Sequence, residues 1–128
     1  MDGALPGTTP LQQLRQFLST FILDSPERRA WWQFWAEVAA QSARDEELRR
    51  QERTRQTSQR RHLENLIQEA ARRGELRAET DAAAAAESIF ALATGLAILE
   101  LAAPDEATIR RASETLDRKS TRLNSSHT

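Results

Sequence analysis

The sequence contains no cysteine. This absence excludes disulfide bonds, thiolate nucleophiles and thiolate metal sites together. Glycine and proline are also scarce, with four of each, whereas alanine, leucine, glutamate, arginine and glutamine fill long stretches. Because glycine and proline interrupt helices while the other five residue types favour them, the composition predicts helices throughout the chain.

The sequence also has no strong excess of basic over acidic residues, or of acidic over basic residues. The chain has 18 basic and 19 acidic residues and a formal net charge of −1. Proteins that hold nucleic acid by charge carry a basic patch, so we expect this chain alone to bind DNA poorly. The N-terminus lacks the basic start and apolar run of a secretory signal. The apolar stretch 89–103 contains Glu100 and is too short to span a bilayer, so a cytoplasmic location is the default expectation.

Motifs that carry catalysis are absent from the sequence. It has no phosphate-binding loop, dinucleotide fingerprint, nucleophile elbow or zinc motif. His62 has no second histidine, cysteine or paired carboxylate at ligand spacing on its helix face. We therefore expect no catalytic residues, no metal site and no cofactor, and we do not expect an enzyme.

Five helices are expected, over residues 10–23, 25–43, 45–73, 81–103 and 104–116. Thr9 and Ser25 each precede a proline, which suits a cap followed by the first helical position. Asp81 caps the fourth helix, Pro104 opens the fifth, and Gly74 is a natural left-handed stop after the third. The apolar residues recur at steps of three and four, as they do in helices with one buried face.

The third expected helix has an unusual middle. Residues 49–62 contain no large apolar side chain. The buried face, traced back from Leu66 and Leu63, passes through His62, Gln59, Arg55 or Gln56, and Glu52. Two interpretations stay open: this polar face lines a pocket, or the stretch crosses open solvent.

The fourth expected helix is apolar on nearly all sides. A helix of this kind must be buried nearly all round, and the rest of so small a chain cannot enclose it. A second subunit is the economical explanation, with the small residues Ala84, Ala91, Gly95 and Ala102 allowing close approach. Glu100 interrupts the helix, either at a surface edge or paired with an arginine, and the edge position is the favoured interpretation.

The C-terminal residues differ in composition from the rest. Residues 1–116 contain fifteen arginines and no lysine, whereas the only lysine and a Ser/Asn run follow after Leu116. Residues 117–127 equal the translation of a common sequencing-library adapter in one reading frame; the alternative is a native, polar, disordered C-terminus. The expected divisions are a flexible lead-in at 1–9, one helical domain at 10–116 and an adapter-derived, disordered tail at 117–128.

Three segments resemble a known family. Residues 25–37, with their SPERRAWWQFWAE sequence, resemble the sixth helix of TetR-family regulators, especially the betaine-repressor-like C-terminal type. Residues 73–77, the four-residue gap that follows, and residues 94–97 resemble that family's junction of the seventh and eighth helices. The likeness covers residues 10–116, and the order and spacing of the motifs carry it.

The resemblance implies an all-α, five-helix TetR-type regulatory domain that forms a homodimer through a four-helix bundle. It implies a pocket for a small-molecule effector and DNA contact only through an N-terminal helix-turn-helix. That helix-turn-helix is expected to be missing from this chain, which would make it a fragment of a transcriptional repressor. The alternative is a stand-alone helical protein–protein interaction module. The genomic sequence upstream of the Met1 codon would separate the two.

Candidate site residues follow from these patterns. The aromatic side chains of the second helix exceed what one packing face needs, although plain core packing is their alternative role. The third helix departs from the family, whose pocket stretch there is usually aromatic or aliphatic. The candidate ligand-binding residues are Trp31, Phe34, Trp35, Val38, Arg55, Gln59, His62, Phe90 and Thr94. The candidate dimer-interface residues are Ala84, Ser88, Ala91, Gly95, Leu99, Ala102, Ile109 and Ala112.

Overall fold

The structure, a computed structural model, describes residues 8–107, 109–111, 113–115 and 118, and all regular elements among them are helical. They comprise α1 (Pro10–Ser19), α2 (Pro26–Ser42), α3 (Glu46–Arg72) and α4 (Ala82–Ala102). Residues 106–107, 109–111 and 113–115 add helical turns after Pro104. The expected all-helical fold class is confirmed.

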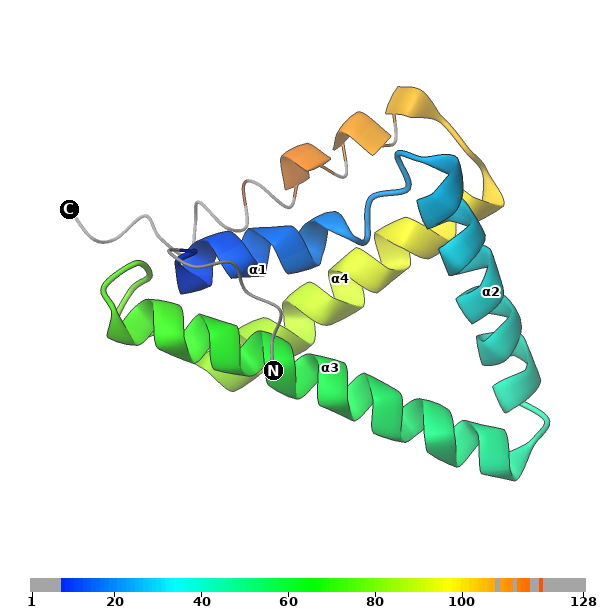
Figure 1. The fold of residues 1–128 in the computed structure, drawn as a ribbon, viewed down its shortest axis with the longest axis horizontal. Helices are drawn as coiled ribbons and strands as arrows, with labels where there is room; N and C mark the ends of the chain where they lie inside the picture. Colours follow the sequence, from blue (N-terminus) through cyan, green and yellow to red (C-terminus); the bar gives the residue numbers. More distant parts are fainter. Residues whose placement is uncertain (1–7, 108, 112, 116–117, 119–128) are drawn as a thin grey trace.

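The longest helix, α3, organises the fold. It packs against α1, α2 and α4, and α2 also packs against α4 (Figure 1). The core lies between α1, the C-terminal half of α3 and α4, where Leu14, Leu63, Ile67 and Leu76 are fully enclosed. The polar N-terminal half of α3 therefore faces α2 rather than this core.

The start of each of the four helices is fixed by a side chain that its own sequence supplies. The Thr9 hydroxyl accepts the backbone N–H of Gln12 at 3.1 Å, and the Gln12 side chain accepts the Thr9 N–H at 2.9 Å, which forms a capping box. Ser25, Asp45 and Asp81 cap α2, α3 and α4, each through a side-chain oxygen that accepts the backbone N–H three residues later, without the reciprocal bond of the capping box. These are the start signals expected from the sequence.

The first helix is shorter than the sequence predicted. It ends at Ser19 instead of about residue 23, and residues 20–22 form turns with backbone bonds three residues back. The carbonyls of this turn are satisfied by side chains of α2: Arg28 donates to the Ser19 carbonyl at 2.7 Å, and Trp32 donates to the Thr20 carbonyl at 2.9 Å. Because α2 supplies these bonds, the chain can leave the helix while Phe21 and Ile22 stay buried.

Helix α4 buries one side and exposes the opposite side. Its buried residues, such as Ala86, Ala93 and Ala97, face α3 and the core, whereas Leu99 is 63% exposed and Ile98 40% exposed. The helix extends beyond the apolar stretch seen in the sequence. With 21 residues, it is long enough and apolar enough to cross a membrane by length and composition. This is weak evidence of a membrane span, because core helices of soluble proteins meet the same test.

Glu100 occupies a buried position, so the favoured prediction of a surface edge was wrong. It is 3% exposed and accepts a hydrogen bond from Arg29 of α2 at 3.1 Å. Its two oxygens also accept the backbone N–H of Asp105. A buried carboxylate needs such partners, and this one joins the start of α2 to the turn after α4.

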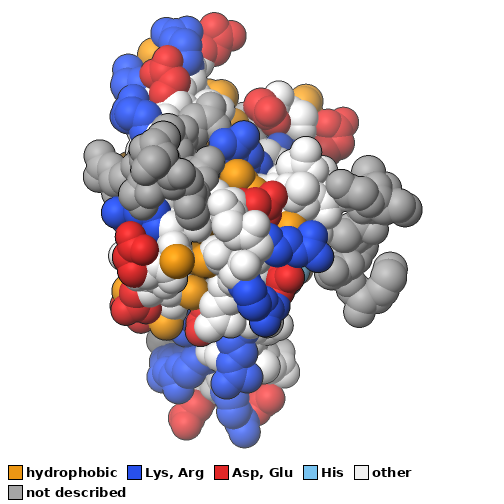
Figure 2. Space-filling model, turned by 90° about the vertical axis from the view of Figure 1, so that its left-hand side faces the viewer, with side chains coloured by type: hydrophobic (Ala, Val, Ile, Leu, Met, Phe, Trp, Pro, Cys, Tyr) orange, Lys and Arg blue, Asp and Glu red, His pale blue; other side chains and the backbone are white. Residues whose placement is uncertain are grey.

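Acidic and basic side chains are intermixed over the face drawn in Figure 2. Several lie in pairs along one helix, such as Arg50 with Glu47 and Arg72 with Glu69. The predicted tail from residue 117 lies outside the described residues except for Arg118, so its packing stays a prediction. Of the two candidate dimer residues after Pro104, Ile109 is half-buried against the core and Ala112 lies outside the described residues.

Candidate functional site

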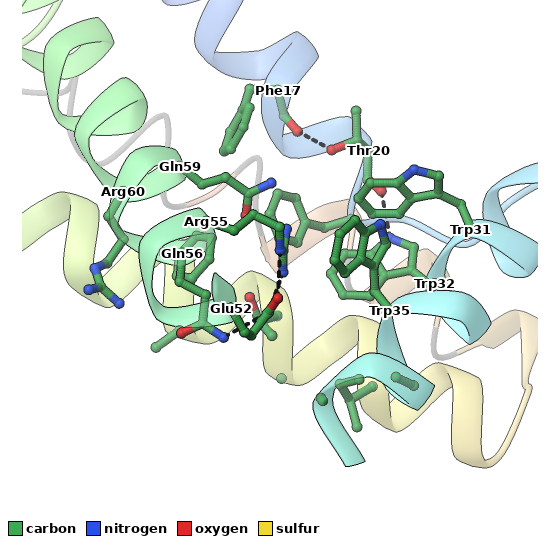
Figure 3. A pocket seen from close by; sticks show the side chains of 18 residues that line it. Phe17, Thr20, Trp31, Trp32, Trp35, Glu52, Arg55, Gln56, Gln59 and Arg60 are labelled. Carbon is green, nitrogen blue, oxygen red and sulfur yellow. Dashed lines mark hydrogen bonds and ion pairs between the residues drawn. The ribbon is translucent and has the colours of Figure 1, made fainter. Parts of the chain in front are cut away.

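A cavity of about 480 Å³ lies among the four helices, beside the polar half of α3 (Figure 3). Its volume falls in the range of pockets that hold small molecules. All four helices and the turn after α1 contribute to it. The lining comprises Phe17, Thr20, Phe21, Trp31, Trp32, Trp35, Ala36, Ala39, Glu52, Arg55, Gln56, Gln59, Arg60, Phe90, Ala91, Thr94, Gly95 and Ile98.

One side of the cavity is a continuous aromatic wall. Trp31 contacts both Trp32 and Trp35, with ring centres 5.5 Å and 5.8 Å apart. Phe21 extends the wall, because its ring centre lies 5.3 Å from Trp32 and 6.1 Å from Phe90. Rings in such tilted and edge-on contact support one another, so the wall is shaped before any ligand arrives.

The side formed by α3 carries an ion pair whose carboxylate is buried and whose guanidinium is half-buried. Arg55 donates to both oxygens of Glu52, at 2.9 Å and 2.6 Å, and Gln56 donates to the same carboxylate at 3.2 Å. The hydrogen bonds from Arg55 hold the pKa of Glu52 below its ordinary value, against burial, which acts to raise it. The Arg55 guanidinium also lies 4.0 Å from the centre of the Trp35 ring. This stacked cation joins α2 to α3 across the cavity.

Three further polar side chains line the cavity without committed partners. Among the described residues, Gln59 and Arg60 make no hydrogen bond or ion pair, although the Arg60 guanidinium lies 5.9 Å from the centre of the Phe90 ring. The Thr94 hydroxyl is buried and has no hydrogen-bond partner. A buried polar group usually has a partner, so the Thr94 hydroxyl can serve a molecule in the cavity. Gln59 and Arg60 are half-buried and have side-chain groups free to bond to the same molecule.

Six of the nine candidate ligand-binding residues lie on the lining: Trp31, Trp35, Arg55, Gln59, Phe90 and Thr94. Whether they bind a ligand stays a prediction. Phe34, Val38 and His62 do not line the cavity. Phe34 is 60% exposed, and the His62 ring packs against Phe17 with ring centres 5.5 Å apart.

The discrepancy on α2 has a simple geometric reason. The cavity is lined by Trp32 and Ala36, and by Trp35 and Ala39, two pairs spaced by four residues. Phe34 precedes Trp35 by one residue, which turns its side chain by about 100° around the helix. The aromatic residues cover more than one face, so their spacing alone did not single out the side that faces inward.

Two residues that shape the site were left out of the candidate list, although the sequence analysis had noted the segments that contain them. Trp32 is the most buried of the tryptophans, and Glu52 holds Arg55 in place. The three-residue spacing of Glu52 and Arg55, typical of ion pairs within a helix, was the available signal. Arg60 had no such signal. The polar face of α3 itself lines the cavity, so the interpretation in which it crosses open solvent is not supported.

Most candidate dimer residues form a stripe on the open side of α4. All six on this helix are exposed: Ala84, Ser88, Ala91, Gly95, Leu99 and Ala102. At 100° per residue they fall within a narrow arc opposite the buried side. Their role in pairing stays a prediction. Ala91 and Gly95 also belong to the cavity lining.

Comparison with known proteins adds the family. Among the described residues, no three histidine, aspartate or glutamate side chains lie together as a metal site would need. No curated protein and no solved structure matches the chain. The family model of the C-terminal region of BetI-type transcriptional repressors matches residues 10–123. Together with the all-helical fold, this match shows that the chain belongs to the TetR-family regulators, as a C-terminal domain of the BetI-type transcriptional repressors.

Proposed function

We propose that residues 10–116 form the effector-sensing and dimerisation domain of a TetR-family transcriptional repressor. The family consists of transcription regulators, which supports a regulatory role rather than an enzymatic one. The observation that carries the effector-sensing part is the cavity of about 480 Å³, with an aromatic wall on one side and uncommitted polar groups on the other. Such a combination gives affinity through the apolar wall and orientation through the polar groups.

The dimerisation part rests on the open side of α4. A stripe of mostly small residues that includes Leu99, with Ile98 beside it, leaves apolar surface exposed on a single chain. A two-fold interface can cover this surface, because each copy offers the same face to the other. Contact with DNA then falls to a recognition head outside residues 10–116, and the domain works in the cytoplasm. We expect residues 10–116 to bind operator-like DNA no better than a neutral protein of the same size.

Binding of a neutral apolar dye tests the sensing function directly. We expect N-phenyl-1-naphthylamine to bind the wild-type chain and to receive energy transfer from the tryptophans. Thr94→Phe should abolish this binding, because the larger side chain occupies the cavity and loses only an unpartnered hydroxyl. Ala83→Phe is the matched control, since Ala83 is exposed on the same helix and does not line the cavity.

The stand-alone interaction module is the second candidate, and the unpaired α4 face favours it as much as the repressor domain. Both candidates predict self-association, so an oligomeric state cannot separate them. Dye binding can, because only the repressor domain requires a ligand cavity. Equal binding by wild type and Thr94→Phe, or no binding at all, would contradict a sensing cavity and leave the module.

A further inference from the structure

The cavity carries one positive charge that no residue of the lining neutralises. Glu52 receives both of its short hydrogen bonds from Arg55, so these two charges compensate one another. Arg60 is the remaining charged residue of the lining, and it makes no hydrogen bond or ion pair with the residues described. The lining therefore has two arginines, one glutamate and a net charge of +1.

The uncommitted groups differ in what they can offer a ligand. Arg60 offers only donors, whereas the side-chain amide of Gln59 and the hydroxyl of Thr94 can each donate or accept. The strongest acceptor, the Glu52 carboxylate, already accepts three hydrogen bonds. A ligand that brings an anionic acceptor thus finds a charged donor in Arg60, whereas a ligand that brings a cationic donor finds only the neutral oxygens of Gln59 and Thr94, unless it displaces Arg55 or Gln56 from Glu52.

The two kinds of surface are separated in space. Figure 3 shows Arg60 on one side of Gln56 and Arg55, and the three tryptophans on the other. A molecule that fills the cavity therefore meets a cation at one end and aromatic faces at the other. This polarity matches a ligand with a charged end and an apolar body.

We propose that the cavity selects a small apolar molecule with a single anionic group, a carboxylate held at Arg60 with its apolar body against the tryptophans. This inference rests on the proposed sensing function and narrows it to one ligand class. Charge-assisted hydrogen bonds from a guanidinium to a carboxylate are about twice as strong as neutral ones. Arg60 is then the residue that sets specificity, and the aromatic wall supplies affinity for many apolar bodies.

The tryptophans provide a built-in measurement. The chain has three tryptophans, and all three line the cavity. No tryptophan lies elsewhere in the chain, so their emission reports on this site. Three probes of nearly equal shape and without ultraviolet absorption near that of tryptophan isolate the charge: 4-cyclohexylbutyrate, 4-cyclohexylbutanol and 4-cyclohexylbutylamine, which are an anion, a neutral alcohol and a cation at pH 7.

We expect the anion to bind the wild-type chain about tenfold or more tighter than the alcohol. Arg60→Gln should remove this preference by weakening the binding of the anion much more than that of the alcohol, and Arg60→Lys should retain part of it. Arg61→Gln is the matched control, because Arg61 is the exposed neighbour on α3, outside the lining, and its loss changes the net charge equally. Circular dichroism checks that each variant keeps its helices.

Every other result contradicts either the ligand class or the sensing function. If the alcohol or the amine binds wild type at least as tightly as the anion, the ligand class is wrong while the sensing cavity stands. The same holds if Arg60→Gln keeps the preference, or if Arg61→Gln loses it too. If none of the three probes changes tryptophan emission, while N-phenyl-1-naphthylamine binds, the anionic class fails alone. If the dye fails as well, the sensing function fails with it.

Discussion

Arg29 and Glu100 form an ion pair across 71 positions of the sequence, with 3.1 Å between the guanidinium nitrogen and the carboxylate oxygen. Glu100 is almost fully buried, and its side chain also receives the N–H of Asp105. The pair ties the first turn of α2 to the last turn of α4. One end of the aromatic helix is thus anchored to the helix that carries the open face.

Removing Arg29 should destabilise the chain substantially. Arg29→Ala leaves a buried carboxylate without its counter-charge, which costs about 3 kcal/mol of the free energy of unfolding. Arg50→Ala is the control, because it breaks an ion pair with Glu47 that is exposed on both sides and is worth less than about 1 kcal/mol. Urea unfolding measures both, and equal losses for the two variants would contradict the role given to Glu100.

A bulky residue at Gly95 should separate the subunits of the proposed dimer. A Cβ added at Gly95 meets no atom within 4 Å in the chain, so the chain has room at this position, and we expect overpacking of about 1–3 kcal/mol against a partner that approaches this face. Gly95→Leu should therefore weaken dimerisation in sedimentation experiments. Replacement of glycine inside a helix stabilises the folded chain itself by less than about 1 kcal/mol, in the monomer and in the dimer alike.

The control for this prediction is Ala83→Leu. Ala83 is exposed on the same helix but lies about 120° away from Gly95 around its axis. A monomeric wild type would contradict the proposed dimer, and a Gly95→Leu variant that dimerises like wild type would place the interface elsewhere.

Gly74 should tolerate asparagine better than alanine. Its φ of +81° lies in the left-handed region, and the backbone N–H of Glu75 bonds to the Ala70 carbonyl at 2.8 Å, which closes α3. No atom lies within 4 Å of an added side chain, so backbone strain of about 1–2 kcal/mol is the only cost for Gly74→Ala. Thermal unfolding should rank wild type above Gly74→Asn and Gly74→Asn above Gly74→Ala.

The Glu52–Arg55 pair should make stability depend on acid. Because the hydrogen bonds from Arg55 lower the pKa of Glu52 in the folded chain, its contribution is present above the ordinary carboxyl pKa of 4.5 and is lost as the pH falls through the lowered value. Wild type should therefore be more stable than Glu52→Gln at pH 7, and the difference should shrink towards pH 3. Urea unfolding at a series of pH values measures this difference, and a difference that grows on acidification would contradict the assignment.

Local features were predictable from the sequence because they depend on neighbouring residues. The caps at Thr9, Ser25, Asp45 and Asp81 and the stop at Gly74 each need only a few consecutive positions. Distant partners were not predictable in this way. The end of α1 depends on Arg28 and Trp32, and the burial of Glu100 depends on Arg29.

The sequence predicted which helices form the candidate site better than it predicted which side of each helix faces the cavity. The polar half of α3 and the aromatic α2 were correctly expected to lie together, as Arg55 over Trp35 shows. Phe34 was placed on the cavity although it points outward, because four aromatic residues within five positions leave the helix without a clear apolar stripe. Arg60 was missed because its place in the site depends on packing against Phe90 of α4, a contact between distant residues that the sequence of α3 does not indicate.

Ala91 and Gly95 belong to two surfaces at once, since they line the cavity and also lie on the exposed stripe of α4. A molecule inside and a second subunit outside would press on opposite sides of the same two residues. Their binding free energies would then be coupled, and by thermodynamic linkage the coupling has the same size in both directions. Diluting the protein would change its apparent affinity for the effector, by the same factor as saturating effector changes the dissociation constant of the dimer.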